Sequence, residues 1–131
     1  MQFKDLKAQY QALKPQIDSA IQSVLDTSEF ILGAPVERLE KTLAAYVGRK
    51  HCITCANGTD ALQLALMAMG VGQGDAVFTS DFTYIASAGA ASLLKAEVIF
   101  ADIDERTFNI SPESLEEAIN HVILEGKLTP K

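Results

Sequence analysis

The sequence predicts an α/β protein in which a mostly parallel sheet has helices on both faces and is preceded by a helical arm. Three short apolar runs alternate with longer runs whose apolar residues recur at helical spacing. The short runs, which we expect to be strands, are residues 51–56, 76–79 and 97–101. Strands that alternate with helices are typical of a parallel sheet with right-handed crossovers. With 131 residues, of which 48% are hydrophobic and 21% charged, the chain can form one globular domain with a core.

The beginning of the chain predicts a helical arm that packs on another part of the protein. Apolar residues recur at helical spacing on both sides of Pro15, which we expect to break or restart the helix. These residues are Phe3, Leu6, Tyr10 and Leu13 before the proline and Ile17, Ala20, Ile21, Val24 and Leu25 after it. The apolar residues 30–33 follow as a crossing segment. We therefore divide the chain into the arm with its crossing segment, residues 1–33, and the first part of an α/β domain, residues 34–131.

Two helices are predicted on either side of the first strand. Pro35 suits the first turn of a helix that Gly48 ends as a C-cap, and residues 61–69 form a second helix that Gly70 stops. The glycine-rich residues 70–75 superficially match a dinucleotide-binding fingerprint, which leaves a strand and enters a helix. Here the order is reversed, so we interpret this stretch as a turn.

Two further helices follow the second and third strands. The alanine-rich residues 86–94 predict a helix with small side chains, which can lie close against a sheet. After the third strand, Ser111 is expected to cap a helix and Pro112 to start it. Its core positions are predicted to be Leu115, Ala118, Ile119, Val122 and Ile123.

Charge and hydropathy argue against two classes of partner. The net charge is −6 and the Lys and Arg residues are scattered, whereas a protein that binds nucleic acid needs a basic face. No apolar run approaches the roughly 20 residues of a membrane helix, and the chain start lacks the apolar core of a signal peptide. We therefore expect no nucleic-acid partner, no membrane partner and a cytoplasmic location.

Cys52 and Cys55 form a C-x-x-C pattern, which is found in redox sites and in zinc sites. In a strand, positions three apart face opposite ways, whereas a redox pair needs a helix N-terminus to lower its thiol pKa. A closed four-ligand zinc site would need both cysteines and both histidines of the chain. We interpret the two residues as buried reduced thiols and expect no metal site.

The stretch Asn57-Gly58-Thr59-Asp60 leaves the first predicted strand and enters a helix. Such a turn directs several backbone N–H groups toward one point at the positive end of the helix dipole, where a phosphate can bind. An ordinary turn with a good N-cap has the same residue pattern. Both interpretations remain open at this point.

Three loops are expected to converge at the carboxyl edge of the sheet, where ligands of such sheets bind. They are residues 57–60, 80–83 and 102–104. In the second loop, Phe82 is an exposed aromatic that can stack on a flat ring beside a phosphate, or pack as a hydrophobic staple on its own helix. In the third, Asp102 and Asp104 could act as acid and base, but we interpret them as structural because strand-end carboxylates commonly cap turns.

A series of short motifs occurs in order along nearly the whole chain. They are Asp5-Leu6-Lys7-x-x-Tyr10, Phe30-Ile31-Leu32-Gly33, Leu39-Glu40 with Tyr46-Val47-Gly48, Gly58-Thr59-Asp60-Ala61-Leu62, Gly72-x-Gly74-Asp75, Phe82-Thr83-Tyr84-Ile85-Ala86, and Asp102-Ile103-Asp104 with Asn109-Ile110. In this order and spacing, the chain resembles the N-terminal part of the DegT/StrS-type sugar aminotransferases. These are pyridoxal-phosphate enzymes of fold type I, the aspartate-aminotransferase fold. The resemblance implies an incomplete, N-terminal portion of their large domain.

The resemblance implies part of a pocket for pyridoxal 5′-phosphate. By that likeness, the backbone amides and the hydroxyl at Gly58 and Thr59 hold the cofactor phosphate, and Phe82 lies against one face of the pyridine ring. Asp60 places a negative charge near this phosphate, although an acid in the first turn stabilises a helix. Asn57 stands where the family often has a small residue such as serine.

The resemblance also implies a reaction for the complete protein. The family transfers an amino group from an amino acid, which we expect to be glutamate, to a keto group on a nucleotide-linked sugar, for amino-sugar and surface-polysaccharide biosynthesis such as that of O-antigen. Its enzymes are homodimers. The family's Schiff-base lysine lies beyond the point reached at Lys131, so we expect no catalytic residue in this chain. We therefore expect the chain to be a fragment that packs against the remainder of the polypeptide.

Two other classes of protein fit the anion-binding turn. One is a non-catalytic module that binds a phosphate compound. The other is a different phosphate-cofactor enzyme on an α/β sheet, such as a flavin protein. A cofactor spectrum would separate these classes from an aminotransferase.

Overall fold

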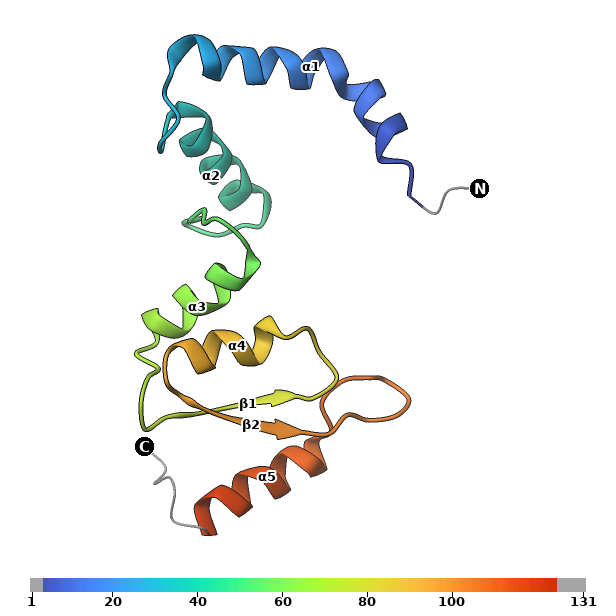
Figure 1. Ribbon diagram of the computed structural model, residues 1–131, viewed down its shortest axis with the longest axis vertical. Helices are drawn as coiled ribbons and strands as arrows, with labels where there is room; N and C mark the ends of the chain where they lie inside the picture. Colours follow the sequence, from blue (N-terminus) through green and yellow to red (C-terminus); the bar gives the residue numbers. More distant parts are fainter. Residues whose placement is uncertain (1–3, 125–131) are drawn as a thin grey trace. The chain divides into compact units, whose positions relative to one another are not determined.

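A computed structural model describes residues 4–124, which form five helices and two strands in two compact units (Figure 1). The first unit extends to Thr54 and the second begins at Cys55. Phe3 and Lys131, which figure in the predictions above, lie outside the described residues. The elements are α1 (Leu6–Thr27), α2 (Ala34–Tyr46), α3 (Gly58–Ala68), β1 (Ala76–Ser80), α4 (Ala86–Leu93), β2 (Glu97–Ala101) and α5 (Pro112–Leu124). The division of the chain at residue 33 stays a prediction.

Helix α1 runs without a break through Pro15, so the predicted break or restart at this proline is wrong. Its N-terminus is capped by Asp5, whose side chain accepts a hydrogen bond of 2.9 Å from the Ala8 N–H. A proline inside a helix removes one backbone hydrogen bond and bends the axis, and α1 is visibly bent along its length (Figure 1). The apolar stripe that continues beyond Pro15 offers the same face for packing on both sides, which favours continuation of the helix.

Helix α2 begins and ends at the residues that its sequence predicts. Pro35 lies in the first turn, and Gly48 has a φ of 65°, the left-handed conformation that favours glycine. The Gly48 N–H donates to the Ala45 carbonyl at 3.2 Å and the Arg49 N–H donates to the Ala44 carbonyl at 2.8 Å. This pattern is a Schellman motif, which satisfies carbonyls that the last helical turn leaves free.

Residues 51–56 do not form a strand, which corrects the prediction of a third strand among the described residues. Both the N–H and the hydroxyl of Thr54 instead donate to one carboxylate oxygen of Glu40 on α2, each at 2.8 Å. A strand needs a neighbouring strand to satisfy its N–H groups, and here a side chain from the preceding helix takes that place. Local apolar character was therefore not sufficient to identify a paired strand.

The two cysteines of this segment differ from the prediction in their burial. Cys52 is half-buried, Cys55 is exposed, and both are free thiols. The thiol of Cys55 donates to the Asn57 carbonyl at 3.3 Å. Their burial was predicted because we placed both residues in a strand inside the sheet. Residues 51–56 are irregular and lie in no sheet, so this reason for burial does not hold.

The Glu40 carboxylate gives a testable pH dependence. Hydrogen bonds from the Thr54 backbone and then from its hydroxyl hold the pKa of Glu40 below its ordinary value of 4.5. A carboxyl whose folded pKa is depressed contributes stability above its unfolded pKa, and this contribution is lost as pH falls through the folded pKa. We expect the protection of the Thr54 amide from hydrogen exchange, relative to the intrinsic rate at each pH, to decline as pH falls below 4.5.

The control for this experiment is another glutamate of α2. Glu37 pairs with Lys41 on an exposed side of the helix and does not bond Thr54, so Glu37→Gln should leave the exchange profile of Thr54 unchanged. Glu40→Ala should abolish the protection at every pH. A Thr54 amide that is protected equally in wild type and in Glu40→Ala would contradict this role of Glu40.

In the second unit, β1 and β2 form a parallel pair with Ala76 opposite Glu97 and Ser80 opposite Ala101. Helix α4 provides the crossover and lies on one face with α3 beside it, while α5 lies on the other face (Figure 1). Parallel pairing and helices on both faces agree with the predicted fold class. Ala90 and Ala91 are completely buried where α4 lies close to the sheet, as small side chains allow.

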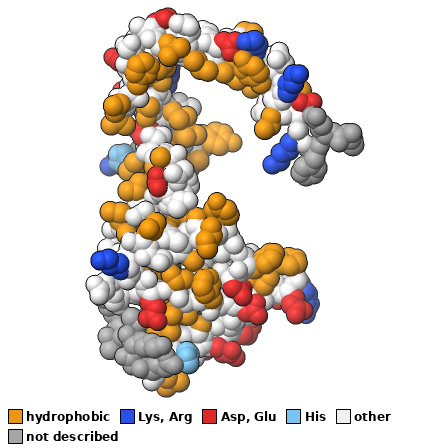
Figure 2. All heavy atoms as spheres, in the orientation of Figure 1, with side chains coloured by type: hydrophobic (Ala, Val, Ile, Leu, Met, Phe, Trp, Pro, Cys, Tyr) orange, Lys and Arg blue, Asp and Glu red, His pale blue; other side chains and the backbone are white. Residues whose placement is uncertain are grey.

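The core of the structure consists of small side chains. The buried apolar residues are Ala44, Ala86, Ala88, Ala90, Ala91, Ala96, Ala101 and Val122. Many larger apolar side chains are exposed, and they are distributed over helices and loops alike (Figure 2). In residues 4–124, no helix is long and apolar enough to cross a membrane.

Candidate functional site

The turn that starts α3 is held by the side chain of Asn57. Asn57 is the N-cap, and its side-chain oxygen accepts a hydrogen bond of 2.9 Å from the Asp60 N–H. Its carbonyl accepts the first helical bond, 3.1 Å from the Ala61 N–H. The cap consumes the third N–H of the helix and leaves the first two for another acceptor. A capped turn and an anion site are therefore compatible at this position.

The carboxylate of Asp60 is tied to the same cap. The side-chain amide of Asn57 donates to Asp60 Oδ2 at 3.1 Å, so the Asn57 side chain bonds both the side chain and the backbone N–H of Asp60. An acid in the first turn interacts favourably with the helix dipole. The structure thus accounts for Asp60 as part of the cap.

Gly58 and Thr59 carry the two N–H groups that remain. Neither has a hydrogen-bond acceptor within the described part of the chain. Gly58 is exposed, and no side chain or other segment among the described residues comes within 4 Å of a Cβ built on it, so this turn is not covered from that side. Two unpaired N–H groups at a helix N-terminus, with free space before them and a threonine hydroxyl alongside, suit a phosphate group.

Phe82 lies in the loop after β1 and its side chain is 64% exposed, in agreement with the prediction of an aromatic presented by a loop. The Phe82 N–H donates to the Ser80 hydroxyl at 3.0 Å, which holds the loop at its start. The ring contacts Phe108 with centroids 5.7 Å apart and planes inclined by 35°. An exposed ring braced on one side retains an open face for a flat ligand.

The loop after β2 contains Asp102 and Asp104, which both accept hydrogen bonds from backbone N–H groups of their own loop. Asp102 Oδ1 accepts from the Ile103 N–H at 2.7 Å. Asp104 Oδ1 accepts from Thr107 at 2.8 Å and from Arg106 at 3.1 Å, and these backbone bonds, that of Thr107 foremost, lower the pKa of Asp104. A carboxylate that is held in its charged form by backbone donors is a poor proton shuttle at neutral pH. These contacts support the structural interpretation of Asp104.

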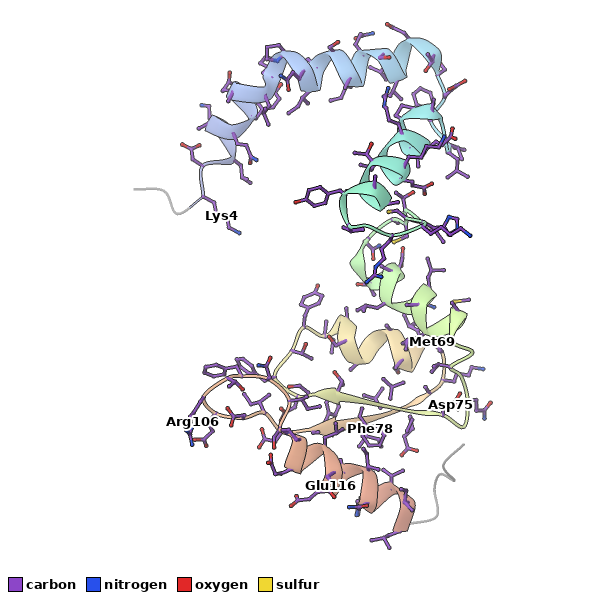
Figure 3. All side chains as sticks on the ribbon, turned by 180° about the vertical axis from the view of Figure 1, so that it is seen from behind. Lys4, Met69, Asp75, Phe78, Arg106 and Glu116 are labelled. Atoms are coloured by element: carbon purple, nitrogen blue, oxygen red, sulfur yellow. The ribbon has the colours of Figure 1, made fainter. Side chains whose placement is uncertain are left out.

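The turn before α3, the loop after β1 and the loop after β2 belong to the second unit. The N-terminal ends of α3 and α4 lie on the side where β1 and β2 end (Figure 1). From behind, Arg106 in the loop after β2 lies at the opposite end of the sheet from Asp75, which precedes β1, and from Met69, which follows α3 (Figure 3). The carboxyl edge of a parallel sheet is where ligands of such folds bind.

Phe108 is the residue of this region that sequence reasoning missed. Its aromatic character and its place beside Asn109 were visible, but no periodicity or spacing connects it with Phe82, 26 positions earlier in the sequence. The contact arises because the two loops follow neighbouring strands.

Comparisons with known proteins place the chain among aminotransferases. The sequence profile of the DegT/DnrJ/EryC1/StrS aminotransferase family matches residues 11–123. Over 119 residues, 91% of this chain, it is 52% identical to a UDP-2-acetamido-2-deoxy-3-oxo-D-glucuronate aminotransferase of Pseudomonas aeruginosa and covers 33% of that protein. The chain thus spans about a third of the length of the curated relatives that it matches.

Solved structures of aminotransferases also match this chain. A DegT DnrJ EryC1 StrS aminotransferase from Brucella abortus matches all of this chain with a TM-score of 0.91 and 46% identity, and the match covers 35% of that protein. NtdA from Bacillus subtilis, solved with bound cofactor PMP, matches 78% of this chain with a TM-score of 0.74 and 33% identity over 23% of its own length. These neighbours have the fold type I architecture, and the chain corresponds to its N-terminal part.

Proposed function

The chain belongs to the DegT/DnrJ/EryC1/StrS aminotransferase family, and we propose that it forms part of a cytoplasmic enzyme that aminates a nucleotide-linked keto sugar. The amino donor is an amino acid, glutamate being the first choice. The observation that carries the proposal is the N-terminus of α3, where Gly58 and Thr59 present two unpaired N–H groups with open space before them. The relative from Pseudomonas aeruginosa, by its name, acts on a UDP-linked 3-oxo sugar acid, which supports a substrate of this class.

The cofactor that we propose for this site is pyridoxal 5′-phosphate. The N–H groups of Gly58 and Thr59 and the Thr59 hydroxyl would bind its phosphate, because the dipole of α3 and free donors act together at that point. Phe82 would lie against the pyridine ring and exclude water from one of its faces. When bound, the cofactor supplies an electron sink for the carbon that gains or loses a proton in transamination. The PMP bound by NtdA is consistent with this cofactor.

The residues of this chain would bind and orient the cofactor. Asp102 and Asp104 bond backbone N–H groups of their own loop, and Asp60 is bonded by Asn57. Because the chain spans about a third of the length of the relatives that it matches, we propose that groups outside it transfer protons and attach the cofactor covalently. The α3 turn would then determine where the phosphate is held.

The exposed apolar side chains support two further partners, the remainder of the polypeptide and a second subunit. Phe30, Ile31 and Leu32 are 65%, 88% and 81% exposed in one short segment. Contiguous apolar surface of this kind is usually covered in the native assembly. We propose that the complete enzyme is a homodimer in which this segment and α1 lie at or near the subunit contact.

The proposed reaction can be tested with the complete enzyme, glutamate and a panel of nucleotide-linked keto sugars. We expect 2-oxoglutarate to appear with at least one sugar of the panel, in an amount equal to the amino sugar formed. A complete enzyme that binds pyridoxal phosphate but produces no 2-oxoglutarate with any sugar would favour a binding module. A flavin spectrum in the purified protein would favour the other alternative.

Two glycine variants give a matched control for the phosphate site. Gly58→Ala places a methyl group in the open space before the free amides and should weaken cofactor binding. Gly89→Ala also places its methyl group in open space, but within α4, where alanine favours the helix. We expect this control to bind the cofactor as wild type does.

A further inference from the structure

Helix α1 passes through Pro15 without interruption, although two local effects oppose this. Proline has no N–H to donate to the carbonyl of Gln11, one turn earlier in the helix. Its ring also disfavours the helical conformation of the residue before it, which is Lys14. Contacts between the side chains around Pro15 can offset both effects.

Lys14 is the centre of a side-chain cluster that spans the proline. Its ammonium group donates to the Asp18 carboxylate and, at 3.2 Å, to the Tyr10 hydroxyl. The same ammonium lies 5.3 Å from the centre of the Tyr10 ring, within range of a cation–π interaction. The Tyr10 hydroxyl in turn donates to Asp18 Oδ1 at 3.0 Å. Each of the three side chains thus contacts the other two.

The bond between Tyr10 and Asp18 connects residues eight positions apart, one on each side of Pro15. The other side-chain hydrogen bonds of α1 in the described chain span three or four positions. Because about two helical turns separate Tyr10 from Asp18, their bond depends on how the helix axis bends between them. It ties the turn before the proline to the turn after it.

The cluster is better shielded from water than a simple ion pair on a helix surface. The Lys14 and Asp18 side chains are 47% and 45% exposed. The Lys41 and Glu37 side chains, an ion pair of the same spacing on α2, are 74% and 64% exposed. Bonds with Asp18 and then Tyr10 raise the pKa of Lys14, and bonds with Lys14 and then Tyr10 lower the pKa of Asp18, so both groups are charged at neutral pH.

We propose that Tyr10, Lys14 and Asp18 form a clasp that holds α1 as one helix across Pro15 and fixes the bend between its two halves. Without the clasp, the proline would act as a hinge, and residues 6–14 would open independently of residues 16–27. A helix that is already continuous loses less conformational freedom when it packs on another surface. The clasp is a property of α1 and does not depend on the proposed reaction.

Hydrogen exchange of the complete enzyme, followed by proteolysis and mass spectrometry, tests the clasp. Tyr10→Phe keeps the ring but removes the hydroxyl that bonds both other members. We expect the amides of residues 6–14 to exchange about two- to tenfold faster than in wild type, the range for loss of a side-chain hydrogen bond. Residues 19–27 should exchange as they do in wild type. Equal exchange of residues 6–14 in the two proteins would overturn the proposal.

A second comparison tests whether the clasp acts against the proline. Pro15→Ala restores the missing N–H and removes the hinge. In this background, Tyr10→Phe should accelerate the exchange of residues 6–14 by less than about twofold, because the two changes are coupled. An acceleration of the same size in both backgrounds would show that the cluster is an ordinary surface contact and not a clasp.

Gln22→Ala is the matched control. It removes a side-chain hydrogen bond of 2.7 Å from Gln22 to Asp26, which lies on the same helix but does not span Pro15. We expect this variant to exchange at wild-type rates in residues 6–14. An acceleration as large as that of Tyr10→Phe would mean that any polar contact of α1 has the same effect, which contradicts the clasp.

Discussion

Removal of residues 1–27 from the complete enzyme should convert the dimer into monomers or aggregates. These residues include α1, and many of its apolar side chains are exposed to solvent in the first unit. Leu6, Ile21 and Leu25 are 69%, 55% and 52% exposed. Each exposed leucine or isoleucine represents about 1.5 to 3 kcal/mol of burial that an interface could recover. The burial of several such side chains at an interface would favour the dimer over the monomer.

A groove beside α1 makes the expected contact more specific. It has a volume of 620 Å³ and is mostly apolar, and its lining includes Ile21, Leu25, Phe30 and Pro35. The groove therefore joins α1 to the crossing segment that we place at the subunit contact. A second chain that filled it would bury both surfaces at once.

Size-exclusion chromatography with light scattering measures the effect. Leu25→Glu places a charge in the groove and should shift the complete enzyme toward monomer, as the deletion does. Gln9→Glu adds the same charge at an exposed polar position of α1 and serves as the control. A soluble, active dimer that lacks residues 1–27 would refute the placement of the arm.

The 131-residue chain expressed alone should show no aminotransferase turnover and no defined covalent adduct with pyridoxal phosphate. The chain spans about a third of the length of the relatives that it matches, and we propose that the groups that attach the cofactor and move protons lie outside it. The turn that starts α3 has two free N–H groups on one helix terminus, and a helix dipole contributes only about 0.3 to 1 kcal/mol to anion binding. Each strand of the two-stranded sheet also has an unpaired edge within the described structure, which favours self-association.

Borohydride reduction after mixing with the cofactor, followed by digestion and mass spectrometry, tests this expectation. We expect low, scattered labelling of surface lysines such as Lys50 and Lys95. The complete enzyme, treated in the same way, is the control and should give one stoichiometric adduct. A single stoichiometric adduct on the isolated chain, with turnover, would show that it carries its own catalytic lysine.

Features that depend on local sequence were predicted correctly. Pro35 and Gly48 mark the limits of α2, Ser111 and Pro112 mark the start of α5, and the alanine-rich stretch gives α4. The turn that starts α3 belongs to the same group, because its cap, Asn57, and its free amides lie within three consecutive residues. In each case the physical cause, a missing N–H, a left-handed φ or a side-chain cap, acts over one helical turn.

The errors arise where a contact distant in sequence, or the continuation of a helix, outweighs a local rule. Residues 51–56 have the apolar character of a strand, yet the backbone of Thr54 bonds Glu40, and Cys55 is exposed in consequence. Pro15 is a helix breaker by local rules, yet α1 continues through it.

The sequence by itself predicted the family resemblance, helices α2 to α5, strands β1 and β2, and the capped turn that starts α3. Only the tertiary structure decided which N–H groups find partners and that Phe108 meets Phe82. Such contacts depend on which loops follow neighbouring strands and on the side chains that reach across them. This is a property of chain topology, and a residue's own neighbours in sequence do not encode it.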